Sequence, residues 1–186
     1  MGVEDKDRLF AMLEERAYRE GDFVLSSGRR SRFYFDSKAV LLDGEGARLC
    51  ARLVLAEMAR LGLRPDAVGG MELGAVPLAC AVSALAPDPP PRIFIVRKQA
   101  KAHGTAKPLE GRIEPGDKVV VLEDVVTTGE STWRAIQAVE AAGAQVIGIF
   151  ALLDRQEGHL AEFDSYGGRF HPLFTLGEFQ RRRTGP

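Results

Sequence analysis

The stretch Lys118–Ser131, KVVVLEDVVTTGES, constrains the fold more than any other part of the chain. The apolar residues 119–122 are typical of a short strand in a parallel sheet that helices cover on both faces. The carboxylates Glu123 and Asp124 follow where this strand is expected to end, and a turn rich in hydroxyl groups comes next. Apolar residues then recur at helical spacing from Trp133. We therefore expect a strand, an acidic pair, a hydroxyl-rich loop and a helix, in that order.

This order of elements suits a particular kind of ligand. The first turn of a helix offers unpaired N–H groups and the positive end of a dipole, and Gly129 lets the backbone come close, so the loop can hold a phosphate. Glu123 and Asp124 would repel that phosphate and should face sugar hydroxyls or Mg²⁺ instead. A phosphorylated ribose carries both groups. A strand-loop-helix unit with a solvated acidic pair fits the same residues, and the pattern alone leaves both interpretations open.

The remaining periodicities predict a single α/β domain. Helices are expected at about 5–19, 43–61 and 75–85, and strands at 67–69, 93–96 and 145–153. Residues 33–35 are expected to form a short strand or a ligand-facing loop, and the tail should add one strand and a short helix. The alternation of strands and helices predicts a mostly parallel central sheet with helices on both faces.

Composition narrows the class of protein. The chain has 186 residues, 45% of them apolar, and a formal net charge of -1. This charge gives no reason to expect nucleic acid or an anionic membrane as a partner. No apolar stretch is long enough to span a bilayer, and the charged start MGVEDKDR lacks the apolar region of a secretory signal. Cys50 and Cys80 lack metal-ligand spacing and are expected to be buried thiols, so we expect a cytoplasmic protein.

Three further segments could face a ligand. Glycines surround Glu72 just after one predicted strand, and such turns let a backbone approach a ligand closely. The segment after residue 96 contains Arg97, Lys98, Lys101 and His103. A basic run of this kind is often only a solvated surface, but a mobile loop can also bring cations to a polyphosphate. Arg155 follows another strand end, where ligands bind in α/β proteins.

Three motifs in this order resemble the type I phosphoribosyltransferases, and among them the orotate phosphoribosyltransferases, over essentially the whole chain. FVLSSGRRSRFYFDSK resembles their hood segment, RKQAKAHG their catalytic loop and EDVVTTGES their ribose-phosphate loop. The resemblance implies a type I phosphoribosyltransferase fold over residues 1–186. Its hood would comprise roughly 1–40, to which the C-terminal tail could contribute, and its core roughly 41–165.

The same resemblance implies Mg²⁺-dependent transfer of the phosphoribosyl group from 5-phosphoribosyl 1-diphosphate (PRPP) to N1 of orotate in pyrimidine (UMP) biosynthesis. It also implies a homodimer with shared active sites. The implied catalytic residues are Lys98, Lys101, His103 and Asp124. PRPP would be bound by Arg97, Lys98, Lys101, His103, Glu123, Asp124, Val125, Val126, Thr127, Thr128, Gly129, Glu130 and Ser131. Orotate would be bound by Thr127, Arg155, Tyr34 and Phe35. No side chain is assigned as a direct ligand of Mg²⁺, which is expected to bind mainly through substrate oxygens.

The chain departs from this family at three places. Ser26 stands where Lys is frequent, Arg32 where Pro is frequent, and Glu72-Leu73 where the pyrophosphate turn often has Tyr-Lys. Two alternatives therefore stay open, a different acceptor base or a regulator that senses PRPP without catalysis. The intact RKQAKAHG segment favours an enzyme over a regulator, and Arg155 favours a carboxylated base because guanidinium groups pair well with carboxylates.

Overall fold

The computed structural model describes residues 2–24, 30–98 and 108–184. At its centre is a six-stranded sheet with the strand order β5-β4-β3-β6-β7-β8. Neighbouring strands are parallel except for β4 and β5, which are antiparallel. The strands are β3 (Ala67–Met71), β4 (Arg92–Val96), β5 (Leu109–Gly111), β6 (Lys118–Val126), β7 (Gln145–Asp154) and β8 (Phe170–Thr175). The prediction of a mostly parallel central sheet is confirmed.

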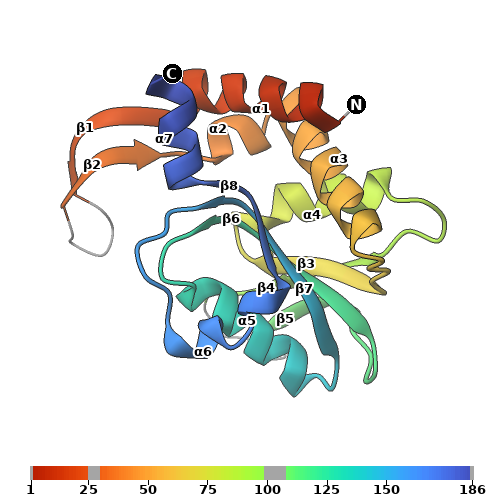
Figure 1. The fold of residues 1–186 in the computed structure, drawn as a ribbon. Helices are drawn as coiled ribbons and strands as arrows, with labels where there is room; N and C mark the ends of the chain where they lie inside the picture. The colour runs from red at the N-terminus through yellow and green to blue at the C-terminus, as the bar shows by residue number, and fades with distance from the viewer. Residues whose placement is uncertain (1, 25–29, 99–107, 185–186) are drawn as a thin grey trace.

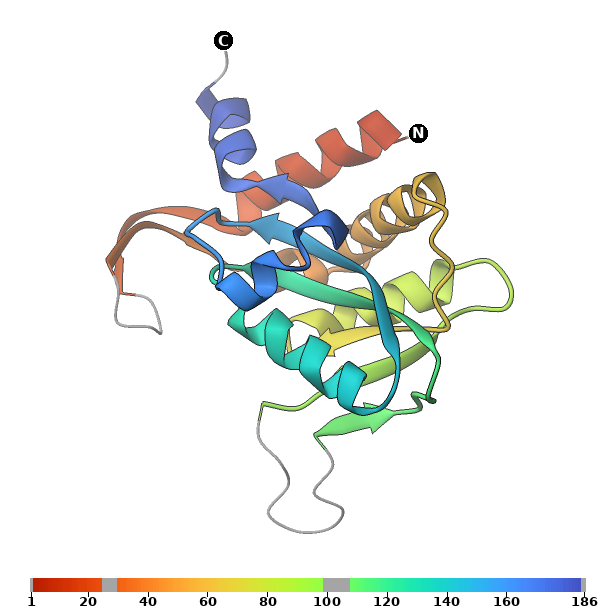
Figure 2. The same cartoon turned by 60° about the horizontal axis from the view of Figure 1, so that its bottom comes forward.

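Helices cover both faces of this sheet (Figures 1 and 2). On one face lie α3 (Gly44–Arg60) and α4 (Ala75–Leu85), with α1 (Gly2–Arg16) packed on α3. On the other lies α5 (Glu130–Ala141), with the short α6 (Ala161–Asp164) beside it. Alternate residues of β6 enter different cores: 120 and 122 pack with α3 and α4, and 119 and 121 pack with α5. Because both faces of the sheet are buried here, residues 119–122 must all be apolar, as they are.

A second, smaller sheet lies at one end of the molecule (Figure 1). It consists of the antiparallel strands β1 (Tyr18–Val24) and β2 (Arg30–Phe35), and the turn-like helix α2 (Lys38–Leu41) follows. The C-terminal helix α7 (Leu176–Thr184) packs on it through Phe179, whose ring centroid lies 5.3 Å from that of Tyr18 and 5.8 Å from that of Phe35. The N-terminal and C-terminal segments therefore build this end of the molecule together.

Two predicted boundaries were wrong. The first helix ends at Arg16 rather than near residue 19, because Tyr18 begins β1 and stacks on the ring of Phe33 at 6.0 Å. Strand β6 does not end before the acidic pair but continues to Val126, because its pairing with β7 continues to Asp154. Tertiary contacts thus override the local pattern in both cases. The helices α3, α4 and α5, the strands β3, β4 and β7 and the final strand and helix are confirmed, whereas β1, α2, β5 and α6 were not predicted.

The strand order reverses direction between β3 and β6. From β3 the chain passes through α4 to β4 on one side, and from β6 it passes through α5 to β7 on the other. At such a point the loops that leave the two strands diverge and open a crevice at their carboxyl ends, where ligands bind in open α/β sheets. The loops after β3 and β6 therefore border the candidate site. In the described ranges, no helix combines the length and apolar character needed to cross a membrane.

Candidate active site

Glu123 lies near the carboxyl end of β6 and is buried, with 5% of its surface exposed. Its Oε1 accepts a hydrogen bond from the backbone N–H of Asp124 at 3.1 Å, whereas its Oε2 has no hydrogen-bond partner among the described residues. Burial raises the pKa of Glu123 well above its ordinary value, and the charge of Asp124 adds to this rise. Buried polar atoms nearly always have a partner, so Oε2 is suited to a polar group of a ligand.

Asp124 is held by three segments of the chain. Its Oδ1 accepts from the backbone N–H of Val125 at 2.9 Å, and its Oδ2 accepts from the hydroxyl of Ser37 at 2.5 Å. Gly74, just before α4, lies so close that a Cβ at this position would be 2.3 Å from Oδ1. The carboxylate therefore sits between the β2–α2 turn and the β3–α4 turn, in the crevice where the strand order reverses.

The hydroxyl-rich loop links β6 to α5 as predicted. Gly129 has a φ of 79°, and a Cβ there would lie 2.7 Å from the ring of Phe163, so both conformation and space favour glycine. Thr127 and Thr128 are half-buried, and Glu130 and Ser131 are exposed in the first turn of the helix. The side chain of Val126 is buried, so any ligand contact at that position would be made by the backbone. The loop thus presents hydroxyls and N–H groups at a helix N-terminus, which suits a phosphate.

The turn after β3 is connected to the start of the basic segment. The carboxylate of Glu72 accepts a hydrogen bond from the backbone N–H of Lys98 at 3.0 Å, and the Glu72 N–H donates to the carbonyl of Val96 at 2.8 Å. The Arg97 side chain pairs with Glu110 at 3.0 Å. The segment that begins with Arg97 and Lys98 therefore starts beside the crevice. Lys101 and His103 lie outside the described residues, as does Ser26.

Arg155 follows β7 and is buried, with 6% of its surface exposed. Its backbone N–H donates to the carbonyl of Val126 at 2.9 Å, and its guanidinium pairs with Glu157 at 2.5 Å and lies 4.5 Å from the ring centroid of Phe33. These contacts place Arg155 beside both the phosphate loop and the small sheet. A guanidinium over an aromatic ring presents a flat, positively charged surface.

The three consecutive aromatic residues of β2 have different surroundings. Tyr34 is 41% exposed, whereas Phe35 is 8% exposed and packs edge-on against Phe179. The Phe35 side chain is thus a core residue, and the ring beside Arg155 is that of Phe33. Sequence reasoning placed Phe33 in a short strand or a ligand-facing loop but did not assign it to the site, although the period of two in a strand puts residues 33 and 35 on the face opposite Tyr34. It also missed Ser37, for which the sequence carries no signal because its partner is 87 positions away.

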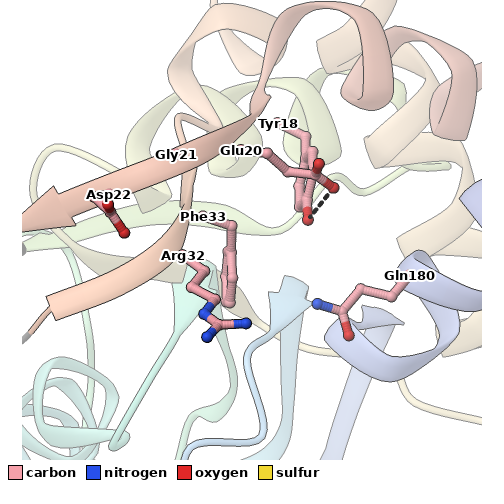
Figure 3. A pocket seen from close by; sticks show the side chains of 7 residues that line it. All are labelled: Tyr18, Glu20, Gly21, Asp22, Arg32, Phe33 and Gln180. Carbon is pink, nitrogen blue, oxygen red and sulfur yellow. Dashed lines mark hydrogen bonds between the residues drawn. The ribbon is translucent and has the colours of Figure 1, made fainter.

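A pocket of about 410 Å³ lies between the small sheet and α7 (Figure 3). In Figure 3 the side chain of Gln180 points from α7 toward β2, and the hydroxyl of Tyr18 donates to Glu20 at 3.3 Å. The lining residues are Tyr18, Glu20, Gly21, Asp22, Arg32, Phe33 and Gln180. Phe33 lines this pocket and also lies under the guanidinium of Arg155, so the pocket borders the candidate site at Phe33.

The carboxylates at the site suit a metal that arrives with its ligand. Among the residues that the structure describes, no group of three or more His, Cys, Asp or Glu side chains could hold a metal. Mg²⁺ at phosphate sites is usually held by one or two carboxylates together with phosphate oxygens and water. The adjacent carboxylates Glu123 and Asp124 therefore fit Mg²⁺ bound through a diphosphate better than a metal held by the protein alone.

Comparisons with known proteins point to one family. Residues 38–167 match the phosphoribosyl transferase domain. The orotate phosphoribosyltransferase of Synechocystis is 44% identical over 176 residues, which cover 93% of this chain and 87% of that protein. The crystal structure of Mycobacterium tuberculosis orotate phosphoribosyltransferase in complex with Fe(III) dicitrate has 33% identity and a TM-score of 0.81, covering 95% of this chain and 99% of that one. The complex of the Mycobacterium tuberculosis enzyme with PRPP has 30% identity and a TM-score of 0.77, with the same coverage of both chains.

The domain match covers residues 38–167, and the relatives align with nearly the whole chain. Both therefore include the loops after β3 and β6 that border the crevice. The chain belongs to the phosphoribosyl transferase family and, within it, to the orotate phosphoribosyltransferases.

Proposed function

We propose that this chain transfers the 5-phosphoribosyl group from PRPP to N1 of orotate in the crevice between the carboxyl ends of β3 and β6. One observation carries the proposal: Gly74 of the turn after β3 lies against Asp124 of β6, which joins a candidate pyrophosphate turn to a candidate sugar-phosphate loop. PRPP carries a phosphate and a diphosphate at opposite ends of one ribose. Two anion sites on either side of an acidic pair match that arrangement.

Each part of the substrate has a proposed set of partners. The loop from Thr127 to Ser131 would bind the 5-phosphate through hydroxyls and the N–H groups at the start of α5. Asp124 would accept hydrogen bonds from the ribose hydroxyls, and Glu123 could accept from a hydroxyl or, when protonated, donate to one. The carboxylate of Asp124 beside the ribose also favours the positive charge that develops on the sugar as the bond to the diphosphate breaks.

In the proposed reaction the bond between C1′ and the diphosphate oxygen breaks, and its electron pair leaves with pyrophosphate. N1 of orotate releases its proton to solvent and forms the new bond to C1′, which gives orotidine 5′-phosphate. Arg97, Lys98, Lys101 and His103 would neutralise the leaving group, and we propose that some of them act across a homodimer in the partner subunit's site. Bound Mg²⁺ would supply further positive charge to the diphosphate.

The base would bind near Arg155, with Thr127 and the exposed Tyr34 as further candidates. Arg155 is supported by its position, because its backbone bonds the end of β6 and its guanidinium covers Phe33. A guanidinium recognises a carboxylate with two parallel hydrogen bonds, which suits orotate better than uncharged bases. Because this reaction is a biosynthetic step on soluble metabolites, we place it in the cytoplasm.

The acceptor is tested with a panel of bases. Purified protein is mixed with Mg²⁺, PRPP and either orotate, uracil, adenine or hypoxanthine, and the absorbance of the base is followed. The proposal expects turnover of orotate and not of the other three. Turnover of uracil at the same rate as orotate would contradict recognition of the carboxylate, and PRPP binding without turnover of any base would indicate a regulator.

A further inference from the structure

We propose that Ser37 is a positioning residue for PRPP, which acts by fixing the carboxylate of Asp124. The Ser37 hydroxyl donates to Asp124 Oδ2 at 2.5 Å, and the side chain is 2% exposed. This inference rests on the proposed function, in which Asp124 binds the ribose hydroxyls. Ser37 itself would not touch the substrate.

The backbone around Ser37 is firmly placed. Its carbonyl accepts hydrogen bonds from the N–H groups of Val40 at 3.0 Å and Leu41 at 2.8 Å, and both of those side chains are buried. The preceding residue, Asp36, donates its N–H to the carbonyl of Ala17 at 2.9 Å. The turn is therefore anchored to the core and to the end of α1, so the hydroxyl has a defined position from which to donate.

The hydroxyl completes the constraints on Asp124. Val125 N–H binds Oδ1, Ser37 binds Oδ2, and the backbone of Gly74 blocks movement toward α4. Each carboxylate oxygen can accept more than one hydrogen bond, so both keep capacity for ligand hydroxyls. A carboxylate already held in its binding orientation loses less entropy when a ligand binds. Without Ser37, Oδ2 would lose a charge-assisted hydrogen bond and the carboxylate could rotate.

This contact gives the N-terminal segment a second role. The resemblance to orotate phosphoribosyltransferases implies that this segment contacts the base. Through Ser37 it would also affect the affinity for PRPP. The expected consequence is a separation of effects: loss of Ser37 weakens PRPP binding more than it slows the chemical step.

The test is calorimetric titration of PRPP with Mg²⁺ into wild-type protein and into Ser37→Ala. The proposal expects the Kd to rise about tenfold, which corresponds to about 1.4 kcal/mol, with kcat at saturating PRPP within about threefold of wild type. Ser37→Cys fills the same space but donates a weaker hydrogen bond, so it should show a similar loss if Ser37→Ala does not fold. The matched control is Ser83→Ala, which removes another hydroxyl hydrogen bond, to the carbonyl of Pro91 at 2.7 Å. Its Kd should equal that of wild type.

A double-mutant cycle separates positioning from a general effect on structure. In the background of Asp124→Asn, Ser37→Ala should have little further effect on the Kd, because both changes act through one carboxylate. Unchanged or tighter binding by Ser37→Ala, or losses that add fully in the double variant, would overturn the proposal. Because PRPP binding is measured without a base, a failure of orotate turnover would refute the proposed reaction and still leave this result interpretable.

Discussion

Gly74→Ala should abolish most of the activity without unfolding the protein. Gly74 has φ -57° and ψ -46°, which alanine adopts easily, so the backbone does not require glycine at this position. The added Cβ would instead lie 2.3 Å from Asp124 Oδ1 and 2.5 Å from its Cγ. Normal contact requires the carboxylate to move by about 1 Å, against hydrogen bonds from Ser37 and Val125. A misplacement of about 1 Å in an active site can cost roughly 10²-fold in rate.

The assay is kcat/KM for PRPP with a thermal melt of the same sample. We expect kcat/KM to fall about 10²-fold, or about 2.7 kcal/mol of transition-state stabilisation, while Tm stays within about 3 °C of wild type. The control is Gly44→Ala at the start of α3, where a Cβ would meet nothing within 4 Å. It should leave kcat/KM unchanged. Wild-type kcat/KM in Gly74→Ala would refute the argument that close contact at this position fixes Asp124.

Three other predictions concern the leaving group, the buried acid and the core. Lys101→Ala should lower kcat by about 10²–10³-fold with a smaller effect on the KM for orotate, and an unchanged kcat would exclude its proposed role at the pyrophosphate. Burial raises the pKa of Glu123 above the ordinary 4.5, so between these two pKa values the folded state holds a proton that the unfolded state releases. The stability of the folded state therefore falls as the pH rises from about 4.5 through the raised pKa. Glu123→Gln should remove this loss of stability, so its Tm should exceed that of wild type at pH 8 and match it near pH 4. Equal Tm values at both pH values would contradict a raised pKa at Glu123. Phe179→Ala empties a fully buried site between α7 and the small sheet and should cost about 3–5 kcal/mol in urea unfolding, whereas a loss below about 1 kcal/mol would show that α7 does not anchor this end.

The sequence predicts the central sheet because its signals are local. The run Val119–Leu122 is apolar at every position, Asp43 caps α3 with its side chain, and Gly143 ends α5 with a φ of 81°. Each of these signals depends on nearby residues. The ribose-phosphate loop was likewise visible, because its residues are consecutive and lie between a strand and a helix.

The features that sequence reasoning missed depend on distant contacts. The local pattern predicts that Tyr18 belongs to the first helix, because its stacking on Phe33 is not visible in the sequence. It likewise predicts that the strand ends at Glu123, because the pairing of β6 with β7 is not visible there. Phe33 meets Arg155, and Ser37 meets Asp124, only after the chain has folded. Periodicity can place Phe33 on one face of its strand, but no motif in the sequence identifies the partner of Phe33 or of Ser37.

The central claim is a transfer of one phosphoribosyl group to orotate for each pyrophosphate released. Phosphorus NMR of a mixture of the protein, Mg²⁺, PRPP and orotate measures both products in one sample. We expect orotidine 5′-phosphate and pyrophosphate to appear in equal amounts as PRPP disappears, and neither to appear without orotate. Unchanged PRPP, or pyrophosphate released without a matching amount of nucleotide, would contradict it.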